Sequence, residues 1–130
     1  MNQILVDTQV LLWLFNGDRK LSSSALQLLS APTSERFFSH AGVWEIAIKY
    51  GKGKLQLPDS PDIFVTKHLK LNKIRPLPIS MASIFAAGAL PQGKHSDPFD
   101  RLMAAQCLRY NLTLVSCDPQ FDSYGVRRIW

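Results

Sequence analysis

The segment that most constrains the fold is residues 4–8, Ile-Leu-Val-Asp-Thr, near the start of the chain. Three apolar residues, two of them β-branched, end abruptly in a carboxylate, and a second apolar run begins at Val10. A short continuous apolar run is typical of a strand buried on both faces of a parallel sheet. Open α/β sheets place ligand-binding groups at the carboxyl ends of such strands. Asp7 is therefore a candidate site residue, and the other acids must be placed relative to it.

Strand and helix patterns alternate along the rest of the chain. Apolar runs predict short strands at 4–6, 36–39, 74–78 and 112–116 and an edge strand at 126–129; Pro76 and Pro78 leave the third only partly paired. Apolar periodicity, serine caps and stop signals predict helices at 8–16, 22–30, 42–50, 61–70, 80–90 and 97–110. This alternation predicts one α/β domain, residues 1–130, with a mostly parallel sheet of four to five short strands flanked by helices.

The composition fits a globular protein with a polyanionic partner. Hydrophobic residues make up 46% of the 130 residues, and no apolar run approaches the roughly 20 residues needed to span a bilayer. Fifteen Lys and Arg against ten Asp and Glu give a net charge of +5, which suits nucleic acid but equally a solvated basic surface. Two cysteines without C-x-x-C spacing and the lack of a secretory signal favour a reduced, cytoplasmic protein.

Asp118 follows the 112–116 strand much as Asp7 follows the first strand. If the two strands are parallel neighbours, both carboxylates emerge at the same edge of the sheet. Each acid also has an ordinary structural alternative. Asp7 could cap the helix that follows it, and Asp118 stands in an Asp-Pro dipeptide of the kind that starts turns.

Asp97 and Asp100 stand three residues apart at a predicted helix start. Asp97 has the features of an N-cap, with proline at the next position, and Asp100 stands where a capping-box acid would be. We assign Asp97 mainly to capping. Asp100 shares its helix face with Ala104 and Cys107, whose small side chains let the helix approach the sheet and leave the carboxylate in a crevice.

Glu45 has the weakest support from pattern. The 42–50 helix carries an apolar stripe at Val43, Ile46, Ala47 and Tyr50, and Glu45 lies away from it. Lys49, four residues on, offers an ordinary surface ion pair. Periodicity alone therefore favours a surface role for Glu45.

Convergence of these acids would dictate the chemistry. Several carboxylates at one place need compensating positive charge, and all-oxygen ligation suits Mg²⁺ or Mn²⁺. Such an ion activates water and neutralises phosphate oxygens, so together with a basic surface it indicates hydrolysis of a nucleic-acid phosphodiester. Phosphate-loop, dinucleotide-binding, zinc-protease and serine-hydrolase motifs are absent, and the three histidines, His40, His68 and His95, lack ligand spacing.

Taken together, these motifs resemble the PIN-domain ribonucleases, and specifically the VapC-like toxins of bacterial type II toxin–antitoxin systems. The matching segments are ILVDTQVLLW at 4–13, VWEIAIK at 43–49, HSDPFDRLMAA at 95–105, LTLVSCD at 112–118 and YGV at 124–126. They run in order across nearly the whole chain. The resemblance implies a PIN-like three-layer sandwich.

The resemblance also implies roles for individual residues. Asp7, Glu45 and Asp100 become the core Mg²⁺ or Mn²⁺ ligands, and Asp118 a fourth position. Asp97 is a secondary candidate, as are the hydroxyls of Thr8 and Ser116, the latter standing where relatives usually carry Thr. Arg101 and the basic turn at Lys52 and Lys54 are candidates for phosphate contact. The family further implies a homodimer, a cognate antitoxin that blocks the acidic site, and a structured RNA substrate such as tRNA or rRNA.

Three other functions remain alternatives. A phosphatase using Asp7 as nucleophile would want a second Asp two positions on, where Gln9 stands. A receiver-like signalling domain with an acidic pocket would want paired acids near the first strand and a Lys ending a late strand, and neither is evident. A regulatory nucleic-acid-binding module would keep its binding after chelation and after acid-to-amide changes.

Overall fold

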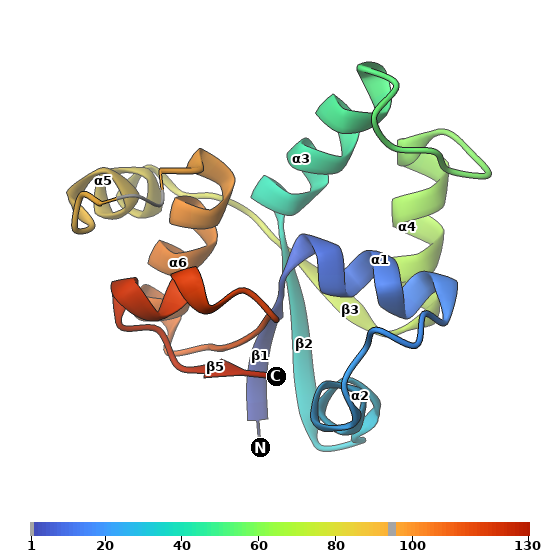
Figure 1. The fold of residues 1–130 in the computed structure, drawn as a ribbon, viewed down its shortest axis with the longest axis horizontal. Helices are drawn as coiled ribbons and strands as arrows, with labels where there is room; N and C mark the ends of the chain where they lie inside the picture. Colours follow the sequence, from blue (N-terminus) through green and yellow to red (C-terminus); the bar gives the residue numbers. More distant parts are fainter. Residues whose placement is uncertain (1, 94–95) are drawn as a thin grey trace.

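A computed structural model describes residues 2–93 and 96–130 and contains a five-stranded sheet within them. The strand order is β3-β2-β1-β4-β5, and every neighbouring pair is parallel. β1 is therefore the central strand, with β2 beside it (Figure 1) and β4 on its other side. The strands are β1 (Asn2–Val6), β2 (Ser34–Ser39), β3 (Ile74–Leu77), β4 (Thr113–Val115) and β5 (Arg128–Ile129).

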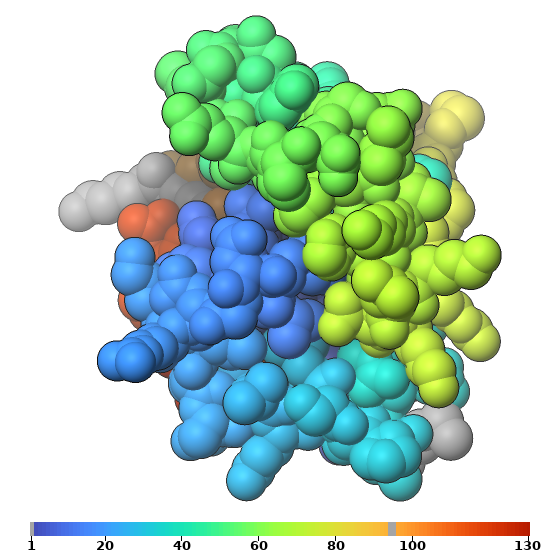
Figure 2. Space-filling view, turned by 90° about the vertical axis from the view of Figure 1, so that its right-hand side faces the viewer, coloured from blue at the N-terminus to red at the C-terminus, as the bar shows by residue number. Residues whose placement is uncertain are grey.

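Helices cover both faces of this sheet and make three layers. They are α1 (Thr8–Asn16), α2 (Ser23–Ser30), α3 (His40–Gly51), α4 (Pro61–Leu71), α5 (Met81–Ala89) and α6 (Pro98–Tyr110), with a 3₁₀-helix at Pro119–Tyr124. Figure 1 shows α5 and α6 on one side of the sheet and α1, α2 and α4 on the other. The space-filling view in Figure 2 shows residues of α1, α2 and α4 side by side across the second of these faces. The predicted α/β sandwich with a mostly parallel sheet is confirmed.

Alternation along the central strands divides the core into two clusters. Ile4 and Val6 of β1 pack with residues of α1, α2 and α4, whereas Leu5 packs with residues of α6 and the 3₁₀-helix. Val115 and Leu114 of β4 divide in the same way. Both faces of the sheet are therefore buried, which explains why β1 reads as a continuous apolar run.

The start of α2 and the ends of α1 and α6 form where the sequence predicts them. Ser22 accepts a hydrogen bond from the Ala25 amide at the start of α2, and Asp97 accepts one from the Asp100 amide at the start of α6. α1 ends at Gly17 and α6 at Asn111, both in the left-handed conformation, with φ of 62° and 54°. None of the helices described is long and apolar enough to cross a membrane.

Helix α3 differs from its predicted form. It begins at His40, because Ser39 caps it by accepting a hydrogen bond from the Ala41 amide. The predicted apolar stripe is wrong at Ala47 and Tyr50, which are exposed. The stripe is confirmed at Ile46, and Glu45 is buried next to it, because α3 packs between α1, α4 and α6 rather than lying flat on the sheet.

Smaller differences occur at strand ends. β2 starts at Ser34, two residues before the predicted start, and β5 is limited to Arg128–Ile129. β3 pairs with β2 alone and so is an edge strand, the position in which Pro76 is tolerated. The 3₁₀-helix after Asp118 was not predicted, since its sequence carries only turn signals.

Candidate functional site

Asp7 lies where two adjacent parallel strands end. The Asp7 amide donates to the carbonyl oxygen of Val115 at 3.0 Å, which continues the β1–β4 ladder to the edge of the sheet. Both carboxylate oxygens of Asp7 are hydrogen-bonded: Oδ1 accepts from the Thr8 amide at 2.8 Å and Oδ2 from the Ser116 hydroxyl at 2.7 Å. The prediction that the first strand and the 112–116 strand are parallel neighbours is thus confirmed.

The Asp7 carboxyl is buried, with 8% of the residue exposed. Desolvation by burial raises its pKa from 3.8 to about 6, and the hydrogen bonds from Ser116 and Thr8 oppose part of that rise. Glu45 and Asp118 raise the pKa further through charge repulsion. Asp7 is therefore a helix cap whose anionic form is destabilised by burial and by nearby negative charge. A cation beside it would offset that electrostatic cost.

Ser116 couples Asp7 to Asp118. Its hydroxyl is completely buried, donates to Asp7 and accepts from the Asp118 amide at 3.1 Å. Asp118 in turn accepts from the Gln120 amide at 2.9 Å, so the turn role foreseen for Asp118 is also real. Ser116 lies behind Asp7 and acts on the pocket through it.

Glu45 reaches the same place from α3. Gly42 makes this approach feasible, because a β-carbon there would overlap the Phe38 ring and lie 3.0 Å from Thr8 Oγ1. The surface role favoured by periodicity is wrong, since only 8% of Glu45 is exposed. The expected partner is correct: Lys49 Nζ lies 2.8 Å from Glu45 Oε2.

Asp97 and Asp100 approach from the start of α6. Asp97 is exposed and its Oδ1 accepts from the Asp100 amide at 3.0 Å, as an N-cap does. Asp100 is half-buried, and the small residues that share its face, Ala104 and Cys107, are buried against the sheet. The helix therefore approaches the sheet closely, as the small residues predict.

One pocket of about 470 Å³ brings these acids together. Its lining includes all four acids proposed as ligands, together with Asp97 and Thr8. The sequence predicts no site role for the other residues that line it, namely Gln9, Leu12, Ile46, Lys49, Leu55 and Cys117. The i+4 spacing from Glu45 could have placed Lys49 in the pocket once Glu45 was assigned to it. Nothing in the sequence marks the other residues as pocket residues.

The residues predicted to contact phosphate lie elsewhere. Arg101 does not line the pocket, because its guanidinium donates to the carbonyl oxygens of Ala87, Leu90 and Pro91 and so ties α6 to the end of α5. Lys52 and Lys54 are exposed in the turn that follows α3. The motif residue His95 lies outside the described residues.

The donor set of the pocket suits a hard divalent cation. Its five acids offer only carboxylate oxygens, the ligands that Mg²⁺ and Mn²⁺ prefer. The buried hydroxyl oxygen of Thr8 has no hydrogen-bond partner, so it is a further oxygen available beside them. Within residues 2–93 and 96–130, no three Asp, Glu, His or Cys side chains are arranged to hold an ion as they stand. The oxygen ligands that the pocket offers therefore fit a divalent cation, and the acidic side chains would have to rotate to bring three of them onto one ion.

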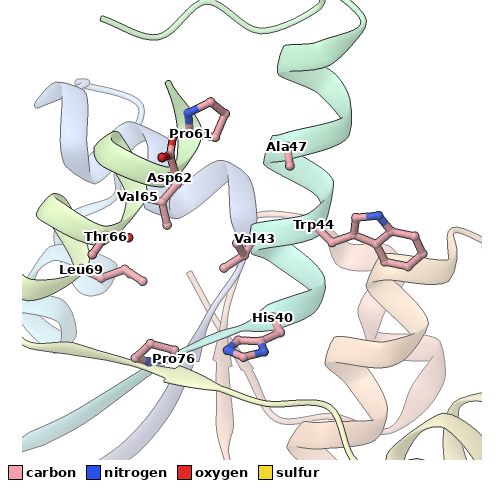
Figure 3. A pocket seen from close by; sticks show the side chains of 10 residues that line it. All are labelled: His40, Val43, Trp44, Ala47, Pro61, Asp62, Val65, Thr66, Leu69 and Pro76. Carbon is pink, nitrogen blue, oxygen red and sulfur yellow. The ribbon is translucent and has the colours of Figure 1, made fainter. Parts of the chain in front are cut away.

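A second pocket, of about 460 Å³, lies on the other side of α3, between α3 and α4. Figure 3 shows Val43 and Ala47 of α3 facing Val65 and Leu69 of α4 across it. Trp44 is 56% exposed beside it and packs edge-on against Phe99 of α6, at 5.1 Å between ring centroids. This pocket is mainly apolar, and Asp62 is the one carboxylate among the described residues that line it.

Solved structures share the fold of this chain. A chain of the VapBC2 complex from Rickettsia felis bound to promoter DNA matches at TM-score 0.68 and 17% identity, over 98% of this chain and 97% of that one. The DNA-bound VapBC of Salmonella typhimurium matches at 0.69 and 16%, over 99% and 98%. A toxin–antitoxin complex from Klebsiella pneumoniae matches at 0.65 and 19%, over 98% and 96%.

Comparison with curated proteins found no match. The sequence itself matches a family described as the PIN domain over residues 4–126. That match takes in β1, α3, α6 and β4, the four elements that carry or adjoin the acids of the pocket. The chain therefore belongs to the PIN-domain family.

Proposed function

We propose that this chain is a metal-dependent endoribonuclease, the toxin of a type II toxin–antitoxin system. The observation that carries the proposal is the gathering of five carboxylates around one pocket at the carboxyl edge of a parallel sheet. The net charge of +5 supports a polyanionic substrate. Membership of the PIN family and the fold shared with VapBC chains support the same conclusion.

Each acid has a role in the proposed site. Asp7, Glu45, Asp100 and Asp118 would hold Mg²⁺ or Mn²⁺. The bound ion would lower the pKa of a water molecule and neutralise charge on the phosphate oxygens. Asp97 would fix the start of α6, and thereby Asp100, through the hydrogen bond to the Asp100 amide.

The supporting groups of the site keep Asp7 oriented. The Ser116 hydroxyl and the Thr8 amide hold its two oxygens, so its carboxylate plane is fixed before a ligand arrives. The metal-binding form of Asp7 is the anion, and its raised pKa means that the carboxyl is only half ionised at about pH 6 and mostly ionised at pH values well above it.

The partners follow from the same proposal. One similar structure, from Klebsiella pneumoniae, is a toxin–antitoxin complex, and we propose that this chain binds a cognate antitoxin that covers the acidic pocket and forms a homodimer. The substrate would be a structured RNA such as tRNA or rRNA, encountered in the cytoplasm.

The test is cleavage of total RNA by the purified protein in Mg²⁺ and in EDTA, beside Asp7→Asn and Asp100→Asn. Asp59→Asn is the matched control, because Asp59 is exposed and outside the pocket. We expect cleavage only with Mg²⁺, retained by the Asp59 variant and lost by the other two. Cleavage that persists in both pocket variants would overturn the proposal. RNA that is bound equally with and without Mg²⁺ but never cut would indicate a non-catalytic binding module.

A further inference from the structure

Lys49 is the one cationic side chain among the described residues that line the acidic pocket. Five carboxylates line the same space, so the pocket carries a large excess of negative charge. The Lys49 ammonium makes its hydrogen bond to Glu45 Oε2 at 2.8 Å. Hydrogen bonding to Glu45, and then the charges of Glu45, Asp97 and Asp100, raise the pKa of Lys49, so the ammonium stays protonated.

The two members of this pair differ in exposure. Only 10% of the Glu45 side chain is exposed, against 52% of the Lys49 side chain. A buried carboxylate without a partner is costly, because it loses its water and gains nothing in return. Lys49 supplies the partner, and its flexible, half-exposed stem lets the ammonium leave without disrupting packed side chains.

The position of Lys49 also conflicts with metal binding. The oxygen of Glu45 that accepts from Lys49 is one of the two that a divalent cation would use. A cation and an ammonium cannot both contact it closely without strong repulsion. Metal binding through Oε2 therefore requires the ammonium to move away, and metal binding through Oε1 alone would place two cations on one carboxylate.

We propose that Lys49 is a resident counter-cation that positions Glu45 in the metal-free protein and competes with the divalent ion for it. This inference rests on the proposed metal site. Lys49 acts through Glu45 and is a positioning residue. By occupying Glu45, it keeps the buried carboxylate paired and oriented in the metal-free state, and it weakens metal affinity in return. Once displaced, the ammonium remains on α3 at the pocket, where RNA phosphates would meet it.

The test measures Mn²⁺ binding by titration calorimetry at pH 7.5 on protein stripped with EDTA. Lys49→Met removes the ammonium, Lys49→Gln removes the charge but keeps a hydrogen-bond donor, and Lys49→Arg keeps the charge. Lys70→Met is the matched control, since it removes one exposed positive charge from α4, outside the pocket. We expect the Met and Gln variants to bind Mn²⁺ about five- to tenfold more tightly, and the Arg and Lys70 variants to bind as the wild type does.

Thermal unfolding gives a second readout. In EDTA the Met variant should unfold at a lower temperature than the wild type, because Glu45 loses its partner, and Mn²⁺ should raise its unfolding temperature more than that of the wild type. A purely structural lysine would lower the unfolding temperature without tightening Mn²⁺ binding, which would overturn the inference. If the Met variant does not fold, the Gln variant decides the question.

The outcomes separate the two proposals. Wild-type protein that binds no Mn²⁺, or Asp7→Asn that binds it as well as the wild type, would contradict the proposed metal site itself. Wild-type binding that Asp7→Asn abolishes, with no gain in Lys49→Met or Lys49→Gln, would contradict only the role assigned to Lys49.

Discussion

At the scale of single residues, two opposing effects act on the carboxylate of Asp7: hydrogen bonds stabilise its charge, whereas burial and nearby acids destabilise it. Its carboxylate has two hydrogen-bond donors, yet it is buried and lies near the charges of Glu45 and Asp118. Burial is the largest effect and raises its pKa to about 6. The ionised form that a metal needs is therefore the form that the metal-free protein tolerates least.

This conflict predicts that Asp7→Asn stabilises the metal-free protein at neutral pH. The pKa of Asp7 is higher in the folded protein, about 6, than its ordinary value of 3.8, so the folded state holds the proton more tightly. Stability from Asp7 is therefore present below about pH 4 and lost as the pH rises through 6. Asparagine has no charge to bury and should raise the free energy of unfolding at pH 7.5 by up to about 2–3 kcal/mol.

The measurement is urea unfolding in EDTA at pH 4 and pH 7.5, with Asp59→Asn as the control for an exposed carboxyl. The gain of the Asp7 variant should be largest at pH 7.5 and shrink at pH 4, while the control should change little at either. An Asp7 variant less stable than the wild type at pH 7.5 would show that hydrogen bonding outweighs burial at this carboxyl.

At the scale of secondary structure, α3 lines two different pockets with two of its faces. Glu45 and Lys49 lie on the acidic pocket, and Val43 and Ala47 lie on the apolar pocket beside α4 (Figure 3). The helix can serve both pockets because its start lies very close to β2 and α1. Gly42 is the residue that permits this, since any β-carbon would meet the Phe38 ring and Thr8 Oγ1.

Gly42→Ala is therefore expected to destabilise the protein and weaken the site together. The added methyl group should push α3 away from Phe38, at a cost of about 1–3 kcal/mol in the free energy of unfolding, and move Glu45 away from Asp7. Gly51→Ala on the same helix is the control, because nothing lies within 4 Å of a β-carbon there. It should be neutral or stabilising by up to about 1 kcal/mol. The two variants are compared by urea unfolding and by Mn²⁺ titration. If Gly42→Ala changed stability and Mn²⁺ affinity no more than Gly51→Ala does, the role given to Gly42 would be contradicted.

The same helix shows how far the sequence alone could predict this molecule. The sequence correctly predicts that Asp7 and Asp118 lie at the same edge of the sheet, because acids at the carboxyl ends of adjacent parallel strands meet there. The burial of Glu45 was not predictable from periodicity, since it depends on the approach of α3 to α1 through Gly42, a contact between separate elements. The position of Arg101 was not predictable for a similar reason: the sequence gives no sign of the three carbonyl oxygens that hold its guanidinium.

At the scale of the whole molecule, charge is strongly segregated. The pocket contains half of the ten acids of the chain and, among the described residues, one of its fifteen Lys and Arg. The surface outside the pocket is correspondingly more basic than the net charge of +5 suggests. An RNA backbone would thus be attracted to the basic surface around the pocket and repelled by the metal-free pocket itself. We therefore expect RNA binding and RNA cleavage to depend on different residues.

The basic residues at the carboxyl edge of the sheet should contribute most to RNA affinity. Lys52 and Lys54 follow α3 just before Leu55, which lines the acidic pocket, whereas α4 runs toward the opposite edge, where β3 begins. We expect the Lys52→Gln/Lys54→Gln double variant to weaken binding and to lower the salt dependence by about one to two ion equivalents. The matched pair Lys67→Gln/Lys70→Gln on α4 should change neither.

The measurement is fluorescence anisotropy with labelled tRNA between 50 and 200 mM KCl, a range over which phosphate contacts lose much of their affinity. Asp100→Asn serves as the background in all samples, so that RNA is bound without being cut. Equal slopes in the two double variants would mean that RNA is held by the basic surface as a whole. A smaller slope in the α4 pair alone would place the RNA at the amino edge of the sheet, away from the acidic pocket, and would contradict cleavage at that pocket as well.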